Sequence, residues 1–269
     1  MITAEFGYRA DAKPLVFVEG GHLLCIGCTG SGKSKTADAI VYGMLRDNPP
    51  EEDFGVIINN PKMVGFEWAA KSPRVKLYSD LTQFESVWTA VWAEVQRRYA
   101  LMELDEDGTR VLPDGVGALF ILTDELPSMI GSEGALLPPA SVKSIKDDML
   151  KILRLGRQAR VYALSFSQFA EGGNVGGTAA RALYDNRICM RVTSDSEVTM
   201  ATGISESEVG NDNLTTFLPG EVLARLEKGV PFMRGWSDYY TDKALNELVE
   251  SLPTPKTPDF AFLAQRGLA

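Results

Sequence analysis

The sequence has one histidine and three cysteines in 269 residues. A structural zinc site needs four Cys or His ligands in a regular spacing, and Cys25, Cys28, Cys189 and His22 show no such spacing. A small, odd number of cysteines also argues against a disulfide scaffold and fits a reducing compartment. Catalysis by a Ser/His/Asp or Cys/His group would depend on the one histidine, which stands beside the start of a predicted strand.

Long apolar runs are missing as well. A run such as 118–122 is far shorter than the ~18 to 20 residues needed to cross a bilayer, and the N-terminus lacks a basic-then-apolar secretion pattern. We therefore expect a cytoplasmic protein with no membrane segment of its own. Positive charge is also scarce, since the formal net charge is -9. This is the wrong sign for coating nucleic acid with the whole surface, so any polyanion must meet a local basic patch.

Apolar segments of strand length alternate with segments of helical period. This pattern predicts an α/β fold with a mostly parallel central sheet flanked by helices. Helices are expected between the strands, with the first after the glycine-rich loop. The predicted strands are 15–19, 23–27, 54–59, 75–78, 118–123, 161–166 and 187–192.

The stretch CIGCTGSGKSKT overlaps a Cys-x-x-Cys pair with a glycine-rich run. A thioredoxin-type pair needs its first cysteine exposed at a helix N-terminus, whereas Cys25 lies inside an apolar strand. The phosphate-loop pattern is complete: Gly27, four residues, then Gly32, Lys33 and Ser34, between a strand and a helix. We therefore predict a phosphate site whose nucleotide-binding residues are Gly27, Cys28, Thr29, Gly30, Ser31, Gly32, Lys33, Ser34 and Lys35.

A second motif, LFILTDELPS, ends an apolar strand with Asp124 and Glu125. Alone, such a pair is typical of a solvated strand end, but in a parallel sheet it lies beside the phosphate loop. We predict that Ser34 ligates Mg²⁺ and that Asp124 holds it through water. Lys33 is predicted to reach the β and γ phosphates, and Glu125 to orient or deprotonate the attacking water. Gln168, at the end of a third strand, is predicted to contact the γ-phosphate.

Several stretches together resemble the motor domain of the FtsK/SpoIIIE family of DNA translocases, within the wider group of HerA-type motors and conjugation coupling proteins. The resemblance covers roughly 13–252. The stretches are GGHLLCIGCTGSGKS, INNPKMVGFEW, VWAEVQRRYALM, LFILTDELPSMI, LRLGRQARVYALSFSQ and DNRICMRVTSDSE. It implies a RecA-like P-loop NTPase core that assembles as a hexameric ring, binds ATP between subunits and draws double-stranded DNA through a central channel.

The resemblance also implies roles for further residues. Arg157 is the first candidate for an arginine finger that acts on a neighbour's nucleotide, and Arg187 is the second, although either would serve equally well in an ion pair. Lys143, Lys146 and Arg181 are candidates for DNA phosphate contacts from loops. Two departures, Asn60 before Pro-Lys-Met and Phe169-Ala170 after the glutamine, put DNA contact and coupling in more doubt than ATP binding.

Two segments stand apart from the predicted core. The polar stretch 103–115 is expected to be a solvated loop, and the proline-rich stretch 253–269 a tail or a strap onto a neighbour. The expected division is therefore a motor domain, 1–252, and a tail, 253–269. A motor of this length suits a plasmid, an integrative element or a phage.

The leading function is an ATP-driven double-stranded DNA translocase. A related coupling or secretion ATPase that moves protein or nucleoprotein is the alternative, which docking of the tail on the motor would favour. A binding protein that keeps the nucleotide but has lost coupling would explain Asn60 and Phe169. A small-molecule kinase would need an acceptor-binding lid, for which the sequence offers no candidate.

Overall fold

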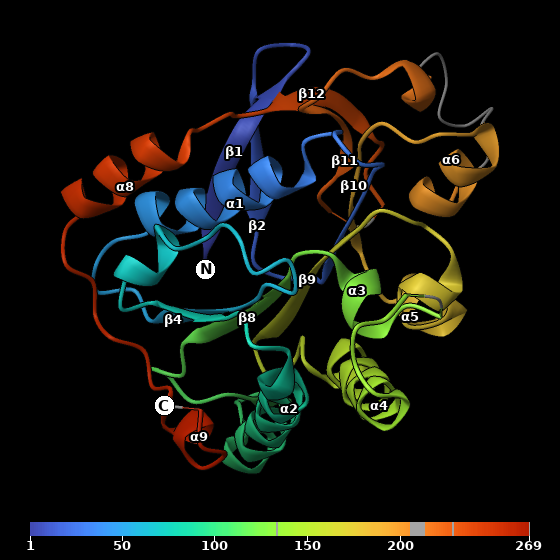
Figure 1. Ribbon diagram of the computed structural model, residues 1–269. Coiled ribbons are helices and arrows are strands. Elements are labelled where there is room, and N and C mark those ends of the chain that lie inside the picture. The colour runs from blue at the N-terminus through green and yellow to red at the C-terminus, as the bar shows by residue number, and fades with distance from the viewer. Residues whose placement is uncertain (133, 205–212, 228, 269) are drawn as a thin grey trace.

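The computed structural model describes residues 1–132, 134–204, 213–227 and 229–268. They form one 10-stranded sheet in the order β2-β1-β12-β11-β10-β3-β9-β8-β4-β5 and a separate two-stranded hairpin. Helices lie on both faces of the sheet (Figure 1). This is the α/β architecture that the alternating pattern predicts.

Six neighbouring strands of the sheet run parallel. Nearly all their residues are buried, because helices cover both faces, and this explains why they read as continuous apolar runs. In sheet order the strands are β10 (Asn186–Cys189), β3 (Leu23–Ile26), β9 (Val161–Ser167), β8 (Ala118–Thr123), β4 (Phe54–Asn59) and β5 (Val75–Tyr78). All six were predicted, three of them with these bounds.

The other four strands extend the sheet in antiparallel fashion beyond β10. They are β11 (Glu221–Arg225), β12 (Met233–Ser237), β1 (Thr3–Arg9) and β2 (Pro14–Val18). Only β2 was predicted. The other three carry charged or glycine residues among their apolar ones, so their sequences alone do not distinguish them from loops.

Two helix layers enclose the sheet. On one face α1 (Lys33–Asp47) and α8 (Asp242–Ser251) pack over β4, β8 and the antiparallel strands. On the other face lie α2, α3, α4, α5 and α6. Their bounds are Phe84–Leu101, Leu126–Ile130, Pro139–Leu155, Thr178–Ala182 and Asp195–Thr202. Short 3-10 turns span Ala69–Lys71, Leu81–Gln83, Gly172–Asn174 and Leu214–Thr216.

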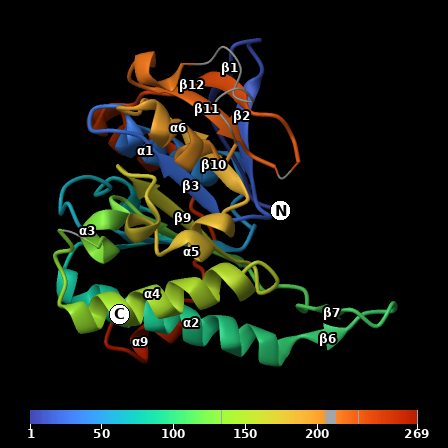
Figure 2. The ribbon, with the colours of Figure 1, turned by 90° about the vertical axis from the view of Figure 1, so that its right-hand side faces the viewer.

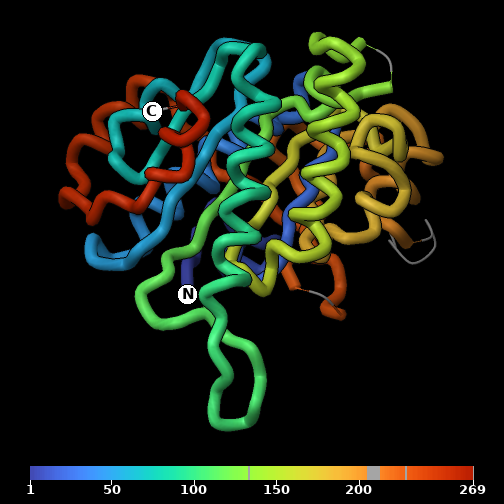
Figure 3. The backbone as a smooth tube through the Cα atoms, turned by 90° about the horizontal axis from the view of Figure 1, so that it is seen from below, coloured from blue at the N-terminus to red at the C-terminus, as the bar shows by residue number. Residues whose placement is uncertain are grey.

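A hairpin extends α2 away from the body of the molecule (Figures 2 and 3). It pairs β6 (Glu103–Leu104) with β7 (Arg110–Val111), and residues 103–111 are all exposed. The expectation of a solvated segment is therefore confirmed for these residues, but the segment is a paired hairpin rather than an irregular loop.

The proline-rich C-terminal segment packs against its own chain. The Lys256 amide donates to the Pro50 carbonyl at 2.8 Å, and the Tyr78 hydroxyl donates to the Leu268 carbonyl at 2.7 Å. Leu263, in the short helix α9 (Ala261–Ala264), is 1% exposed in the core cluster that includes α2. The segment thus straps the β4-β5 edge of the sheet to α2 within one subunit.

Among the described residues, no helix combines the length and the apolarity needed to cross a bilayer.

The strap predicts a measurable stability effect. Leu263→Ala should lower the free energy of unfolding by about 2–4 kcal/mol, because it leaves a cavity in the core beside α2. The matched change Leu104→Ala removes a side chain that is 69% exposed on the hairpin and should cost less than about 0.5 kcal/mol. Urea unfolding followed by circular dichroism measures both, and equal effects would show that the strap contributes no core packing.

Candidate active site

The glycine-rich loop follows β3 at the carboxyl edge of the sheet and leads directly into α1. Gly30 and Gly32 have positive φ values of 75° and 106°. A Cβ atom on Gly27 would lie 2.6 Å from Ser31 Oγ, and one on Gly32 would lie 2.9 Å from the Gly220 nitrogen. These positions therefore need glycine, and the resulting loop brings main-chain N–H groups and the positive end of α1 to one point.

Lys33 is buried inside this loop. Its Nζ donates to the carbonyl oxygens of Gly27 at 2.6 Å and Cys28 at 3.1 Å. Burial lowers the pKa of the Lys33 ammonium, and the nearby Glu125 carboxylate partly offsets this shift. The loop thus holds a cation beside its own N–H groups, where a polyphosphate would be bound.

The two predicted metal ligands meet although they are 90 residues apart in the chain. Ser34 Oγ donates a hydrogen bond to Asp124 Oδ2 at 3.1 Å. Asp124 directly follows β8 and is 1% exposed. A hydroxyl and a carboxylate are hard oxygen ligands of the kind that Mg²⁺ prefers. The described residues contain no group of three or more His, Cys, Asp or Glu that would hold a metal ion, so phosphate oxygens and water would have to complete its coordination.

Gln168 connects Glu125 to the phosphate loop. Its Nε2 donates to Glu125 Oε2 at 2.7 Å, while Thr29 Oγ1 donates to Gln168 Oε1 at 2.9 Å. Glu125 itself is buried and has left-handed backbone angles, φ 74° and ψ 63°. A non-glycine residue in this region costs on the order of 1–3 kcal/mol and is typical of functional sites.

Lys62 lies in the same site, although the sequence did not single it out. Its Nζ is 3.0 Å from Asp124 Oδ2, donates to Ser34 Oγ at 3.1 Å and lies 3.6 Å from Glu125 Oε2. The signal was the Pro-Lys-Met triplet, which follows β4 at the same edge of the sheet. The sequence connected that triplet to a family but not to the nucleotide site.

Arg191, which follows β10, lies on the other side of the loop from Gln168. Its Nε donates to Cys28 Sγ at 3.5 Å, and the Cys28 amide donates to the Arg191 carbonyl at 2.7 Å. It also escaped the sequence reasoning, which considered Arg187 in the same stretch. The side chain of Lys35, a predicted nucleotide-binding residue, pairs with Asp38 at 3.0 Å and with Asp242 of α8 at 2.6 Å.

The two candidate finger arginines lie away from the phosphate loop of their own chain. Arg157 precedes β9, so it is at the opposite edge of the sheet, and it pairs with Asp185 at 3.3 Å while 62% of its side chain is exposed. Arg187 is buried and donates to the carbonyl oxygens of Ala201 at 2.9 Å and Arg181 at 2.7 Å. An exposed guanidinium is free to face a second subunit, whereas that of Arg187 is engaged inside its own.

The three candidate DNA contacts are on helices rather than on the loops that the sequence suggested. Lys143 and Lys146 lie in α4, the former exposed and the latter half-buried, and Arg181 lies in α5. Arg181 also donates to the Ala170 carbonyl at 2.9 Å. All three residues therefore lie on helices, and of the three only Lys143 is exposed.

The thiols and the histidine do not form a catalytic group. Burial raises the pKa of the Cys25 thiol and raises that of Cys189 to about 12, so neither is a thiolate at neutral pH. Burial lowers the pKa of His22 to about 4, and its Nδ1 accepts from the Ala163 amide at 3.0 Å. His22 is thus a neutral core side chain that joins β9 to the start of β3.

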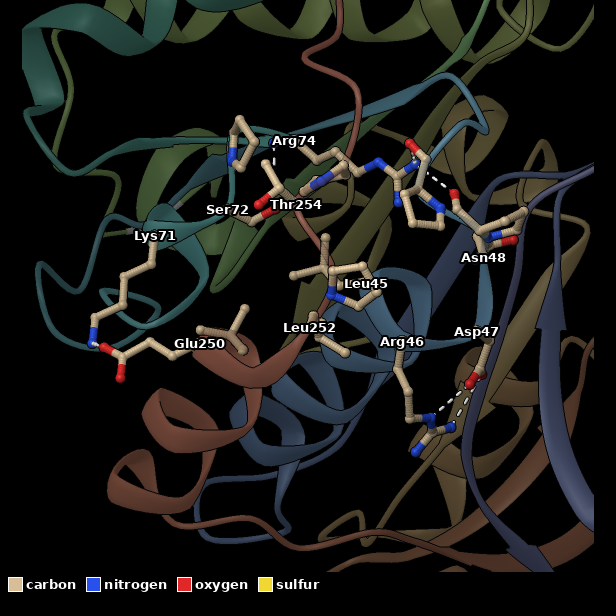
Figure 4. A pocket seen from close by; sticks show the side chains of 16 residues that line it. Leu45, Arg46, Asp47, Asn48, Lys71, Ser72, Arg74, Glu250, Leu252 and Thr254 are labelled. Carbon is tan, nitrogen blue, oxygen red and sulfur yellow. Dashed lines mark hydrogen bonds and ion pairs between the residues drawn. The ribbon is translucent and has the colours of Figure 1, made fainter.

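A cavity of about 510 Å³ lies at the far end of α1 from the phosphate loop (Figure 4). Its charged side chains have partners within the chain: Arg46 pairs with Asp47 at 2.6 Å and Lys71 with Glu250 at 2.6 Å. The Arg74 guanidinium donates to the carbonyl oxygens of Pro49 and Pro50. These contacts lie within α1, between the turn at Lys71 and α8, and between Arg74 and the segment after α1, so they account for these charged groups as structural contacts.

Comparison with known proteins agrees with this site. The sequence profile of the FtsK/SpoIIIE family matches residues 7–120. A DNA translocase FtsK from Helicobacter pylori (strain J99) is 27% identical over 253 residues, which is 89% of this chain and 28% of that protein. The chain is therefore similar to the FtsK/SpoIIIE family in sequence. It spans about a third or less of the FtsK relatives that it matches.

Solved structures show that this chain has the fold of P-loop ATPase domains. The cytoplasmic domain of the type VII secretion ATPase EccC from Thermomonospora curvata has a TM-score of 0.70, with 20% identity, and the match covers 95% of this chain and 32% of that one. The pCW3 conjugation coupling protein TcpA, solved with ATPγS, has a TM-score of 0.69 and 16% identity over 92% of this chain and 70% of that one.

The burial of His22 predicts the pH dependence of stability. Because the pKa of His22 in the folded chain is about 4 and the ordinary value is 6.5, the unfolded chain takes up the proton first as the pH falls. This contribution to stability is complete above pH 6.5 and is lost between pH 6.5 and about 4, by ~3 kcal/mol in total. His22→Gln should remove this part of the slope in urea unfolding. Because the chain has a single histidine, NMR can follow its titration directly, and a midpoint near 6.5 would contradict the prediction.

The bridge through Gln168 predicts a separation of binding from turnover. Gln168→Ala should leave the Kd for ATP within about threefold, because Lys33 and the loop remain, and should lower kcat by about 10- to 100-fold, because Glu125 loses its tie to Thr29. Gln265→Ala, an exposed change in the strap, is the matched control. Nucleotide titration and steady-state ATP turnover measure the two effects, and an equal loss in both variants would contradict a role for the bridge.

Proposed function

We propose that this chain is an ATP-driven double-stranded DNA translocase that works as a hexameric ring in DNA transfer, segregation or packaging. The observation that carries the proposal is the gathering of Lys33, Ser34, Asp124, Glu125 and Gln168 at one edge of the sheet, in a chain similar to the FtsK/SpoIIIE family. Lys33 and Ser34 come from the phosphate loop, Asp124 and Glu125 from the end of β8, and Gln168 from the end of β9, and together they would supply binding, metal coordination and water activation. A phosphate-binding loop alone would supply only the first.

The residues divide the work of ATP hydrolysis among them. The loop amides and Lys33 hold the phosphates, and Ser34 and Asp124 hold Mg²⁺, which neutralises charge on the transferring phosphoryl group. Glu125 accepts the proton of the attacking water, since its carboxylate follows Asp124 at the end of β8 and lies in the same site. Gln168 donates to the Glu125 carboxylate and accepts from Thr29 of the phosphate loop. It therefore links the residue that activates water to the loop that binds the phosphates.

A ring would complete the site with an arginine from a neighbouring subunit. Arg157 is the stronger candidate because its side chain is 62% exposed, while Arg187 is buried and donates to two carbonyl groups of its own chain. An arginine supplied in this way stabilises negative charge in the transition state and is worth 10³–10⁵ in rate in other phosphate-loop enzymes.

The proposed cargo is the DNA duplex, bound through its phosphates. A chain of net charge -9 repels DNA over most of its surface, so cations must gather along the bore of the ring. Lys143 is the first candidate because it is exposed on α4, and Lys146 and Arg181 are the next. The relatives named DNA translocase support this cargo.

The second candidate is an ATPase that moves protein or nucleoprotein. Two observations favour it: the proline-rich segment docks on the motor domain, and the fold is similar to that of the secretion ATPase EccC. The strap contacts are those of core packing, so they weigh less than the sequence similarity to FtsK.

ATP turnover with and without linear duplex DNA separates the two candidates. A translocase should show turnover stimulated severalfold by duplex, and the stimulation should fall as salt rises, because phosphate contacts release counterions. Glu125→Gln should bind ATP with unchanged affinity and lose at least about 100-fold in kcat. Glu250→Gln, in an exposed ion pair on α8, is the control and should turn over normally.

Two outcomes would count against the proposal. An ATP turnover rate that is unchanged by duplex DNA, by single-stranded DNA and by DNA ends would favour the candidate that moves protein. A Glu125→Gln variant that hydrolyses ATP at the normal rate would show that the Asp-Glu pair does not serve this site.

A further inference from the structure

Lys62 contacts every acidic side chain of the site. Its Nζ lies 3.0 Å from Asp124 Oδ2 and 3.6 Å from Glu125 Oε2, and it donates to Ser34 Oγ at 3.1 Å. Asp124 and Glu125 are 1% and 4% exposed. The ammonium therefore lies between the two oxygens that would coordinate Mg²⁺ and beside the proposed base.

The charges of the site balance because Lys62 is there. Two buried carboxylates, Asp124 and Glu125, face two cations, Lys33 and Lys62. Buried carboxylates are costly unless opposite charge compensates them. Lys33 is occupied by the loop carbonyl groups of Gly27 and Cys28, so Lys62 is the cation that contacts Asp124 directly.

A tight turn after β4 aims Lys62 into the site. Asn60 Nδ2 donates to the carbonyl oxygens of Val64 at 3.1 Å and Gly65 at 3.2 Å, which closes the turn around Lys62. Met63 and Phe66 have positive φ values of 58° and 68°. Backbone strain of this kind persists only where the surroundings fix it. Asn60, which departs from the usual aspartate, thus holds the turn through its amide donor.

We propose that Lys62 is a positioning residue that acts as the resident cation of the metal site. It excludes a divalent cation from Ser34 and Asp124 until nucleotide phosphates draw the ammonium away, so that metal binds with the nucleotide and not before it. The proposal rests on the function proposed above. In this proposal, the Pro-Lys-Met turn sets the order in which nucleotide and metal ion bind.

The two cations compete for the same oxygens. Lys62 Nζ lies 3.1 Å from Ser34 Oγ and 3.0 Å from Asp124 Oδ2, so an ion held by these two side chains would lie beside the ammonium and share its partners. Two positive charges at that separation in a buried site repel each other strongly. A bound triphosphate removes this competition, because its oxygens give the Lys62 ammonium a new partner beside Lys33 and leave Ser34 and Asp124 to the metal ion.

Mn²⁺ binding without nucleotide tests the proposal directly. Free Mn²⁺ is measured by electron paramagnetic resonance with the wild-type chain, Lys62→Met and the control Lys71→Met, which breaks an ion pair with Glu250 at 2.6 Å far from the site. We expect Lys62→Met to bind Mn²⁺ at least about tenfold more tightly than the other two. Equal weak binding by all three would overturn the proposal.

Two further measurements keep the result interpretable. Lys62→Arg restores a cation and should again bind Mn²⁺ as weakly as the wild type. This result would show that the charge of residue 62, and not the shape of Met, sets the affinity. Tight binding of Mn²⁺ by Lys62→Arg would contradict the charge argument. Melting curves check that each variant is folded, and Lys62→Gln replaces Lys62→Met if that variant is not.

Adding ATPγS separates this inference from the proposed function. With nucleotide present, the wild type should bind Mn²⁺ within about threefold of Lys62→Met, because the phosphates release the ammonium. If the wild type binds nucleotide but its Mn²⁺ affinity does not rise, release of Lys62 is refuted while the nucleotide site stands. If the wild type binds no nucleotide at all, the proposed function fails, and the comparison made with Mn²⁺ alone still decides whether Lys62 blocks the metal.

Discussion

The structure of the site depends on compensated charge at the carboxyl edge of a parallel sheet. Asp124 and Glu125 are buried there beside Lys33 and Lys62, and Ser34 and Gln168 donate further hydrogen bonds to Asp124 and Glu125. None of these charges would be stable alone in the interior, because transfer of an unpaired ion from water is costly. The same balance makes the site responsive, since a bound polyphosphate and its metal change the partner of every member.

The register of the parallel strands makes this convergence possible. Thr123 of β8 pairs with Ser165 of β9, and Ile26 of β3 pairs with Ser167, so all three strands end side by side. The residues that follow are Asp124, Gln168 and Gly27. Since the strands are buried on both faces, a shift of register would move apolar side chains out of the core, and the core therefore fixes the site.

Sequence reasoning succeeded where a local pattern carries the physical information. The glycine loop, the strand that ends in Asp124 and Glu125, and the six parallel strands are local patterns of this kind. Sequence reasoning failed for β1, β11 and β12 for two reasons. β1 pairs with β12 from the far end of the chain, and all three strands mix charged or glycine residues with apolar ones, so that no clear strand pattern appears. It also did not place Lys62 or Arg191, since a single basic residue after a strand carries no local signal of what it will contact.

The sequence by itself determined that a glycine-rich loop before a helix and an Asp-Glu pair after a buried strand would be present, because each is encoded by adjacent residues in one motif. Only the tertiary structure decided which cations face those acids, that Lys35 turns to α8 while Lys62 turns inward, and that the C-terminal strap closes its own subunit. The physical reason is that charge pairing and packing act between segments far apart in the chain, and their outcome depends on how the sheet brings those segments together.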